Sequence, residues 1–209
     1  PVAHSFPTRR SSDLIQKRLY VLCQLEGGDI AYHLTEAVQI DGQLDEDRLE
    51  DCFGRLIQRH ESLRTGFEIQ GDDIQTFVEP QVDFKIIRDH VSEDNLETFL
   101  NTCIQPFDLS DPPLMRIHLI SVSPSANHRP ATSNQLLLID IHHIIADGLS
   151  VNILIQELTQ LYEGKSLEPV RGQYRDYVRW EKEYLASETF KADEAFWLSQ
   201  FSGEIPALN

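Results

Sequence analysis

The spacing of apolar residues along the chain predicts strands and helices that alternate. Apolar residues that alternate with polar ones, or that run together in a short segment, are typical of strands. The segments with these patterns are 32–40, 64–69, 74–78, 82–86, 115–122 and 136–141. Apolar residues at helical spacing predict helices over 46–57, 93–104, 151–162, 174–187 and 190–201. This alternation indicates an α/β domain with a mixed β-sheet and flanking helices.

Local signals mark where these elements begin, turn and end. Asp45 and Ser92 are expected N-caps, because a side-chain oxygen just before a helix can accept a free backbone N–H. Gly71-Asp72-Asp73 predicts a hairpin turn between two strands. Leu136–Ile141 is apolar on both faces, which predicts a central strand covered on both sides. Ser123–Asn134 is polar, lacks periodicity and is expected to be a loop.

The composition is ordinary for a soluble globular protein, and the net charge argues against some classes of binding partner. Hydrophobic residues make up 41% and charged residues 25% of the 209-residue chain. The formal net charge of −16 argues against nucleic acid and against an anionic membrane, since both attract basic surfaces. The three cysteines are too far apart for a zinc motif or a disulfide framework, and Cys52 and Cys103 are expected to be buried on apolar helix faces. A cytoplasmic location is therefore expected.

The residues best suited to catalysis follow the predicted central strand. Two adjacent histidines end this strand, and an acid and a glycine come shortly afterwards: His142, His143, Asp147 and Gly148. An imidazole can transfer a proton near neutral pH, and backbone N–H groups at the start of the next helix can stabilise negative charge. Neighbouring residues of a strand point to opposite faces, so the two histidines are expected in different surroundings. This combination is expected of an acyl-transfer site.

The motif His142-His143-x-x-x-Asp147-Gly148 resembles the core signature of condensation domains of nonribosomal peptide synthetases. Further stretches resemble motifs of that family, in the same order along the chain: residues 16–22, 59–67, 106–116 and 174–180. The resemblance covers Ile15 to the end of the chain. It implies a chloramphenicol-acetyltransferase-like layered sandwich, and this chain is expected to be one lobe of a two-lobe domain.

The chain is expected to consist of two segments, with the boundary after Leu14. Residues 1–14 resemble the read-through of a sequencing adapter and are expected to be a non-native or disordered leader. They lack the apolar segment of a secretory signal. By the resemblance, residues 15–209 are the N-terminal lobe of a condensation domain with the start of the crossing to the second lobe. Because the C-terminal lobe is missing, the isolated fragment is expected to be inactive.

The resemblance implies an enzyme that forms peptide bonds. In the family's reaction, an amine on one carrier-bound aminoacyl thioester attacks the thioester carbonyl of another aminoacyl or peptidyl group. The implied partners are donor and acceptor peptidyl carrier proteins, an adenylation domain in the same chain and the missing lobe. The substrates arrive on the phosphopantetheine of the carriers. No cofactor or metal is expected to bind this domain directly, and the other histidines lack metal-ligand spacing.

The resemblance also implies roles for the residues of the motif. His143 and Gly148 are the expected catalytic residues, because His143 can accept a proton or position the amine. Gly148 is expected to provide an unusual backbone angle, close approach to the substrate and an N–H for the oxyanion. His142 is expected to be structural. Asp147 either holds the imidazole, as in a catalytic triad, or pairs with an arginine, and the resemblance favours the pair. The candidate partners at the site are Arg64 and Arg59, with Arg116 as a third.

Other functions stay open. An epimerisation domain shares the motif but removes a proton from the α-carbon, and the Trp-Arg pair associated with such domains is absent after the motif. A cyclisation domain is disfavoured because it has acids in place of the two histidines. A non-catalytic recruitment or docking lobe usually lacks the second histidine, which is His143 in this chain.

Overall fold

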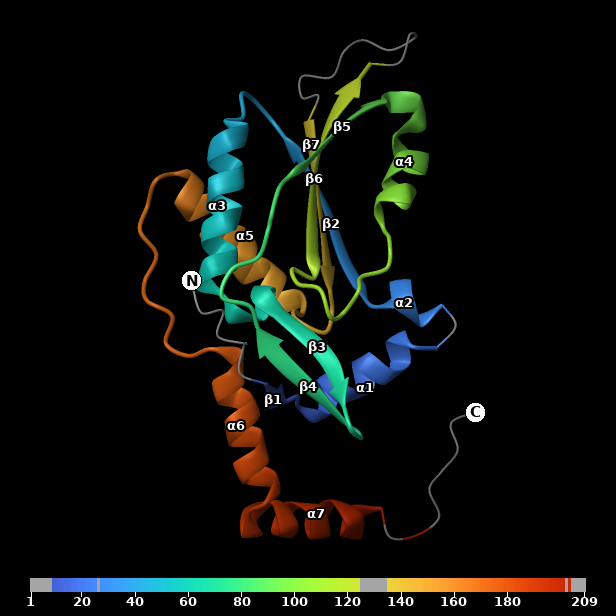
Figure 1. Cartoon of the computed structure of the whole chain (residues 1–209), viewed down its shortest axis with the longest axis vertical. Helices are drawn as coiled ribbons and strands as arrows, with labels where there is room; N and C mark the ends of the chain where they lie inside the picture. The colour runs from blue at the N-terminus through green and yellow to red at the C-terminus, as the bar shows by residue number, and fades with distance from the viewer. Residues whose placement is uncertain (1–8, 26, 125–134, 202, 204–209) are drawn as a thin grey trace, which may run out of the picture. The chain divides into compact units, whose positions relative to one another are not determined.

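The computed structural model describes residues 9–25, 27–124, 135–201 and 203 (Figure 1). The chain divides into two units, Pro1–Arg171 and Gly172–Asn209. The strands of the described residues and the histidine motif all belong to the first unit. None of the described helices is long and apolar enough to cross a membrane.

A four-stranded mixed sheet lies at the centre of the first unit. Its strands have the order β2 (His33–Ile40), β7 (Gln135–His142), β6 (Met115–Ser123) and β5 (Ile87–Ser92). β7 is antiparallel to both of its neighbours, and β5 is parallel to β6. The residues of β7 from position 137 onward are all buried, as expected for a strand covered on both faces. The predicted central strand is therefore confirmed.

Two helices cover one face of this sheet. α3 (Glu46–Arg59) and α5 (Gly148–Tyr162) contact each other along that face (Figure 1). Ile139 and Ile141 of β7 meet apolar side chains of both helices, among them Phe53. Because side chains alternate along a strand, every second residue of β7 faces these helices.

The helix α4 (Leu96–Cys103) packs on the opposite face of the sheet (Figure 1). Leu138 of β7 belongs to a smaller apolar cluster on that side, together with Cys103 of α4. The same alternation puts Asp140 and His142 on this second face, away from α3 and α5. The polar side chains that end β7 are thus separated from the larger part of the core.

A second, three-stranded sheet has the order β1 (Arg10–Ser11), β4 (Asp73–Val78) and β3 (Thr65–Gln70). β3 and β4 form the predicted hairpin, and Gly71 in its turn has a positive φ of 63°. A short 3₁₀ helix, η1 (Glu61–Arg64), leads into β3.

The described residues that precede α1 (Leu14–Cys23) have defined places in the structure. β1 pairs with β4, and Ser12 Oγ donates to a β4 carbonyl (2.7 Å). Asp13 is buried and caps α1 by accepting the Gln16 N–H (2.7 Å). The expectation of disorder is therefore wrong for residues 9–14, while residues 1–8 lie outside the described residues. That this leader is non-native stays a prediction.

The predicted strand over 82–86 is wrong, because β5 begins only at Ile87. The apolar alternation of this segment comes from packing against the core, to which Val82 and Phe84 contribute. The Glu50 carboxylate of α3 accepts the backbone N–H of the segment's last residue, residue 86 (3.2 Å). The segment therefore packs on α3. Apolar residues at every second position suit this packing as well as they suit a strand.

The two expected N-caps have different outcomes. Asp45 accepts the Arg48 N–H (3.0 Å) and is confirmed as the N-cap of α3. Ser92 is the last residue of β5, and a 3₁₀ turn, η2 (Glu93–Asn95), separates it from α4. Ser92 makes no capping hydrogen bond through its side chain, so this expectation is wrong. Of the predicted loop after β6, residues 125–134 lie outside the described residues.

The second unit contains α6 (Tyr174–Leu185) and α7 (Glu188–Gln200), close to the two predicted helices. Aromatic rings stack along α6, with centroid distances of 5.7 Å between Tyr177 and Trp180 and 5.4 Å between Trp180 and Tyr184. The Trp180 side chain nevertheless stays 54% exposed. Within this unit the aromatic face of α6 is open to solvent.

Candidate active site

The segment from His142 to Asp147, here called the histidine turn, joins β7 to α5. Its first N–H, that of His142, donates to the carbonyl of Leu114, just before β6 (3.0 Å). The next N–H, that of His143, donates to the Tyr32 carbonyl at the start of β2 (2.7 Å). Main-chain hydrogen bonds therefore fix the positions of both histidines.

His142 is a buried histidine with both ring nitrogens in use. Its Nδ1 accepts the Ile144 N–H (3.0 Å), and its Nε2 lies 3.4 Å from Cys23 Sγ. An Nδ1 that accepts a hydrogen bond leaves the ring proton on Nε2, which therefore donates toward the sulfur. Burial and, to a smaller extent, nearby His33 lower the pKa of His142 to about 4. A neutral, buried and hydrogen-bonded ring is what a structural role requires.

His143 has the opposite environment, because it is exposed. Within the described part of the chain, its hydrogen bonding involves the backbone, and no hydrogen bond reaches its ring. The alternation of side chains at the end of β7 accounts for this difference from its neighbour. The His143 imidazole can therefore meet a substrate from solvent, and its catalytic role stays a prediction.

Asp147 is the N-cap of α5. Its Oδ1 accepts both the N–H (2.8 Å) and the hydroxyl (2.6 Å) of Ser150. These two hydrogen bonds hold the pKa of Asp147 below its usual value, and His143 adds a smaller lowering. The carboxylate is therefore directed at the start of the helix, where it satisfies an N–H that would otherwise be free.

The expected ion pair between Asp147 and an arginine is wrong for the described structure. Arg64 is buried and donates to main-chain carbonyls around the end of α3, and Arg59 binds Glu157 of α5 (3.0 Å). Arg116 lies beside a different carboxylate. Each of these guanidinium groups lies beside another partner, and the Asp147 carboxylate caps α5. Arg64 and Arg59 thus stabilise the surrounding fold and do not contact the carboxylate of the motif.

Gly148 is the first residue of α5 and has an ordinary backbone. Its φ is not positive, and a Cβ added to it would meet no atom within 4 Å. The expected unusual backbone angle is therefore wrong. The position at the start of a 15-residue helix gives its N–H the positive end of the helix dipole. A catalytic role for this N–H stays a prediction.

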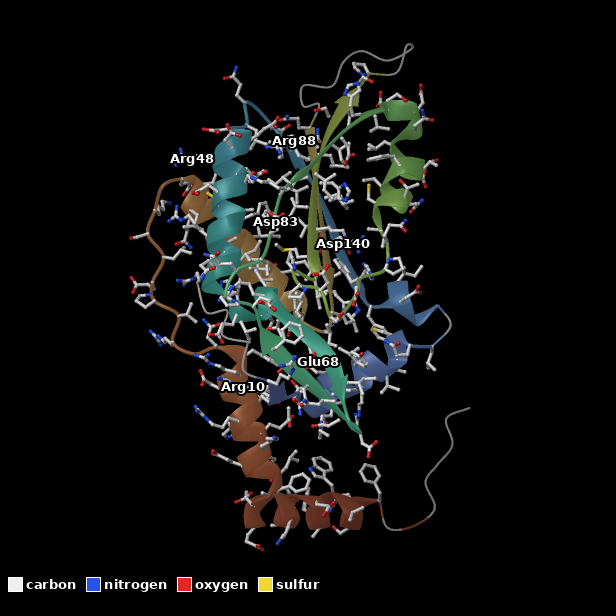
Figure 2. The ribbon with its side chains drawn as sticks, viewed as in Figure 1. Arg10, Arg48, Glu68, Asp83, Arg88 and Asp140 are labelled. Carbon is white, nitrogen blue, oxygen red and sulfur yellow. The ribbon has the colours of Figure 1, made fainter. Side chains whose placement is uncertain are left out.

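The sequence prediction missed a buried polar cluster beside the histidine turn. Asp140 of β7, labelled in Figure 2, is completely buried. Its Oδ1 lies 2.7 Å from His33 Nδ1, and its Oδ2 lies 3.6 Å from Arg116 Nη2. Phe107 joins the cluster, because His33 stacks on its ring (5.0 Å) and Arg116 lies over it (3.8 Å). The signal in the sequence is a single acid within an apolar strand, which requires a buried partner.

A cavity of about 460 Å³ opens beside His142. Side chains of α1, β3 and the segment 107–110 form most of its wall: Tyr20, Cys23, Gln24, Phe67, Ile69, Phe107, Asp108, Leu109 and Ser110. Asp29 and Glu68 complete its acidic lining. His142, and not His143, is the histidine of the motif that lines this cavity.

The cysteines are unpaired and buried: Cys23, Cys52 and Cys103. The expected burial of the second and third is confirmed, and burial raises the pKa of each thiol. The described residues contain no group of three or more histidine, cysteine, aspartate or glutamate side chains that could hold a metal ion.

The mixed sheet, its flanking helices and the histidine turn after the central strand define a chloramphenicol-acetyltransferase-like α/β protein. The family model of the condensation domain matches residues 12–209. The chain therefore belongs to the condensation-domain family of nonribosomal peptide synthetases.

Similar curated proteins are large peptide synthases. Tyrocidine synthase 3 of Brevibacillus parabrevis is 40% identical over 195 residues, which are 93% of this chain and 3% of that protein. Surfactin synthase subunit 1 of Bacillus subtilis (strain 168) is 41% identical over 194 residues, 92% of this chain and 5% of that protein. The chain thus spans a small part of the length of these relatives.

Solved structures of lower identity share the fold. The X-domain from teicoplanin biosynthesis is 24% identical, with a TM-score of 0.81 over 97% of this chain and 45% of that chain. The starter condensation domain of rhizomide synthetase is 17% identical, with a TM-score of 0.75 over 96% of this chain and 51% of that chain. The fold of this chain therefore corresponds to about half of each of those chains.

Proposed function

We propose that this chain is the N-terminal half of a condensation domain that joins carrier-bound aminoacyl or peptidyl thioesters through a peptide bond. The observation that carries the proposal is the exposed His143 imidazole, whose backbone is held just after the central strand and beside the start of α5. Membership of the condensation-domain family and 40% identity to tyrocidine synthase 3 support it.

The reaction sets two chemical requirements. The amine nitrogen attacks the thioester carbonyl carbon, the carbon–sulfur bond breaks, and the carrier leaves as a thiol after it takes up a proton. The attacking amine must lose a proton, which an imidazole near neutral pKa can accept or guide. His143 is the residue for this step, because His142 is buried and uses both ring nitrogens.

Negative charge on the former carbonyl oxygen requires N–H donors. Asp147 already occupies the Ser150 N–H, so this donor is not available to a substrate. The N–H groups of Gly148 and Leu149 precede it in the first turn of α5. Free N–H groups at a helix start, reinforced by the helix dipole, suit a developing oxyanion.

The partners follow from this chemistry. Donor and acceptor carrier proteins deliver the substrates on phosphopantetheine arms, and an adenylation domain loads them. The relatives named as synthases are many times longer than this chain, which leaves room for such domains in a parent protein. A complete condensation domain, consisting of this chain and its C-terminal half, is the form in which activity is expected.

The test is the substitution His143→Ala in the complete condensation domain of the parent synthetase. Dipeptidyl thioester formation from loaded carriers should fall about 100-fold or more, the scale of a lost proton-transfer group. His90→Ala is the matched control, because His90 is also an exposed histidine and lies on β5, away from the histidine turn. Near-normal peptide formation by folded His143→Ala would remove this residue from the mechanism.

The same assay separates the two remaining functions. An epimerisation domain would convert a single carrier-bound L-residue to its D-form without an acceptor. A recruitment lobe would form no product with wild-type His143 present. Chiral analysis of the thioester products therefore decides between peptide-bond formation, epimerisation and recruitment.

A further inference from the structure

The cavity beside the histidine turn has the size of a small-molecule site. Its volume is about 460 Å³, and pockets that bind small molecules commonly measure about 300–1,000 Å³. The helix α1, the strand β3 and the segment 107–110 form most of its wall, and His142 at the end of β7 completes it. His143, the residue proposed to transfer the proton, directly follows His142 in the chain. The cavity therefore adjoins the proposed site of reaction.

Part of the cavity wall is apolar. Phe67 of β3 and Leu109 are buried core residues, and the half-buried Tyr20 of α1 adds an aromatic ring. Methylene groups of a ligand gain free energy when they leave water for such a wall. The apolar residues therefore suit the carbon chain of a ligand.

Three carboxylates also line the cavity, and two of them have no cation beside them. Glu68 forms an ion pair with Arg9. Within the described part of the chain, the carboxylate of Asp29, in the short helix α2 (Gly28–Ala31), has no hydrogen bond or ion pair. The Asp108 carboxylate accepts the N–H (2.9 Å) and the hydroxyl (2.7 Å) of Ser110, both uncharged donors. The residues that line the cavity include no lysine or arginine, so its wall has an excess of negative charge.

The two unbalanced carboxylates act on other groups of the wall. Burial is the larger cause that raises the pKa of Tyr20, and the charge of Asp108 adds to it. Burial likewise raises the pKa of the Cys23 thiol, with a contribution from Asp29. His142 does not offset these charges, because its pKa of about 4 leaves the ring neutral near pH 7. A concave site with charges of one sign attracts ligands of the opposite sign.

We propose that this cavity binds the side chain of a carrier-bound aminoacyl substrate that ends in an ammonium group, and that Asp29 and Asp108 select that group. A side chain of the lysine type suits both parts of the wall, because its stem is apolar and its end is a compact positive charge. That the ligand is a carrier-bound substrate rests on the function proposed above. The preference of the cavity for an ammonium group does not, because it follows from the wall alone.

Methyl NMR of the complete condensation domain tests the preference without catalysis. The domain is titrated with N-acetyl-lysine methylamide, while the methyl signals of Ile69 and Leu109, which line the cavity, are followed. N-acetyl-norleucine methylamide has the same carbon stem without the ammonium group and is the comparison ligand. The lysine compound should bind about 5-fold more tightly, the scale of an exposed ion pair. Equal affinities, or unchanged signals of both residues, would overturn the proposal.

Asp29→Asn and Asp108→Asn test the two carboxylates. The amide removes the negative charge and keeps an oxygen that can accept from Ser110. Each substitution should reduce the preference for the lysine compound to about 2-fold, if the two carboxylates contribute equally. Asp94→Asn is the matched control, because Asp94 of η2 is an exposed aspartate that does not line the cavity. An undiminished preference in both cavity variants would overturn the selection by Asp29 and Asp108.

Carriers loaded with lysine or norleucine, each tested as donor and as acceptor, provide the functional arm. In one of these two positions, kcat/KM for dipeptidyl thioester should be about 5-fold higher with lysine, and Asp29→Asn should lower this ratio. Equal rates in both positions, with the NMR preference intact, would reject the carrier-bound substrate in favour of a free ammonium compound. A wild-type domain that forms no peptide bond with any loaded carrier would contradict the proposed function, whereas the NMR titration would still decide the preference of the cavity.

Discussion

The two adjacent histidines show how one position along a strand decides what a residue can do. His142 is buried, and its pKa of about 4 leaves it neutral near physiological pH. His143 is exposed, and no hydrogen bond from the described residues reaches its ring. This difference is the reason why His143, and not the neutral and buried His142, is the residue proposed to transfer the proton.

Asp147 leads to a prediction at the same scale. Asp147→Ala should lower the free energy of unfolding by about 1 kcal/mol, because the first turn of α5 loses its N-cap. Asp147→Asn should cost only a few tenths of a kcal/mol, since an amide oxygen can still accept from Ser150. Urea unfolding of both variants checks this order. Equal losses for Ala and Asn would indicate that the negative charge, and not the cap, matters for stability.

The sequence predicts the different surroundings of the two histidines but not the partners of the acids. Alternation along a strand follows from covalent geometry and needs no knowledge of the fold. Asp147 could serve a helix cap or an ion pair with equal chemical plausibility, and only the positions of distant arginines decide. Asp140 and His33 are 107 positions apart, so their contact depends on the pairing of β2 with β7.

Among the helices, a half-buried ionic group joins α3 and α5 beside their apolar packing. Arg59 at the end of α3 binds Glu157 of α5 (3.0 Å), and the following residue, His60, lies 2.6 Å from the same carboxylate. Burial raises the pKa of Glu157, but the hydrogen bonds from His60 and Arg59 outweigh it, so the net shift is downward. The ionised carboxylate therefore stabilises the packing of the two helices.

Glu157→Gln should lower the free energy of unfolding by about 1 kcal/mol at neutral pH, because a half-buried charge pair, partly screened by water, loses one partner. A carboxyl group with a lowered folded pKa stabilises above its ordinary value, here 4.5, and this contribution is lost as the pH falls through the folded value. The variant should therefore approach the stability of the wild type below about pH 4.5. Asp51→Asn, in an exposed pair of α3, is the control and should change stability by less than about 0.5 kcal/mol. A constant difference across pH would contradict the ionic explanation.

Most helices and strands could be predicted from local patterns, and the wrong prediction of a strand over 82–86 shows what such patterns lack. The predicted central strand, the hairpin and α3 all have patterns that tertiary contacts reinforce. The segment 82–86 alternates in the same way, but its side chains pack on α3, and none of the described strands pairs with it. Alternation reports which side chains are buried, and it does not report whether a neighbouring strand is present to pair.

For the whole molecule, the decisive feature is apolar surface that the described residues leave uncovered. Such side chains lie on α1, at the start of α5 and on α7: Leu14, Ile15, Val21, Leu22, Leu149, Ile153, Phe196, Trp197 and Leu198. Leu149, next to the motif glycine, is 72% exposed. Large exposed apolar residues that gather on a few elements are typical of surfaces that bind other protein.

The 209-residue chain should therefore self-associate and should not form peptide bonds alone. It corresponds to about half of the solved condensation-domain chains, so in the proposed two-lobe domain His143 faces a second lobe. Without that lobe, water reaches the site, weakens its electrostatics and competes for the thioester. The test is sizing chromatography of the purified chain together with an assay for dipeptidyl thioester from loaded carriers. Addition of a separately produced C-terminal half should reduce self-association and restore turnover, whereas turnover by the monomeric chain would show that one lobe is a sufficient acyltransferase.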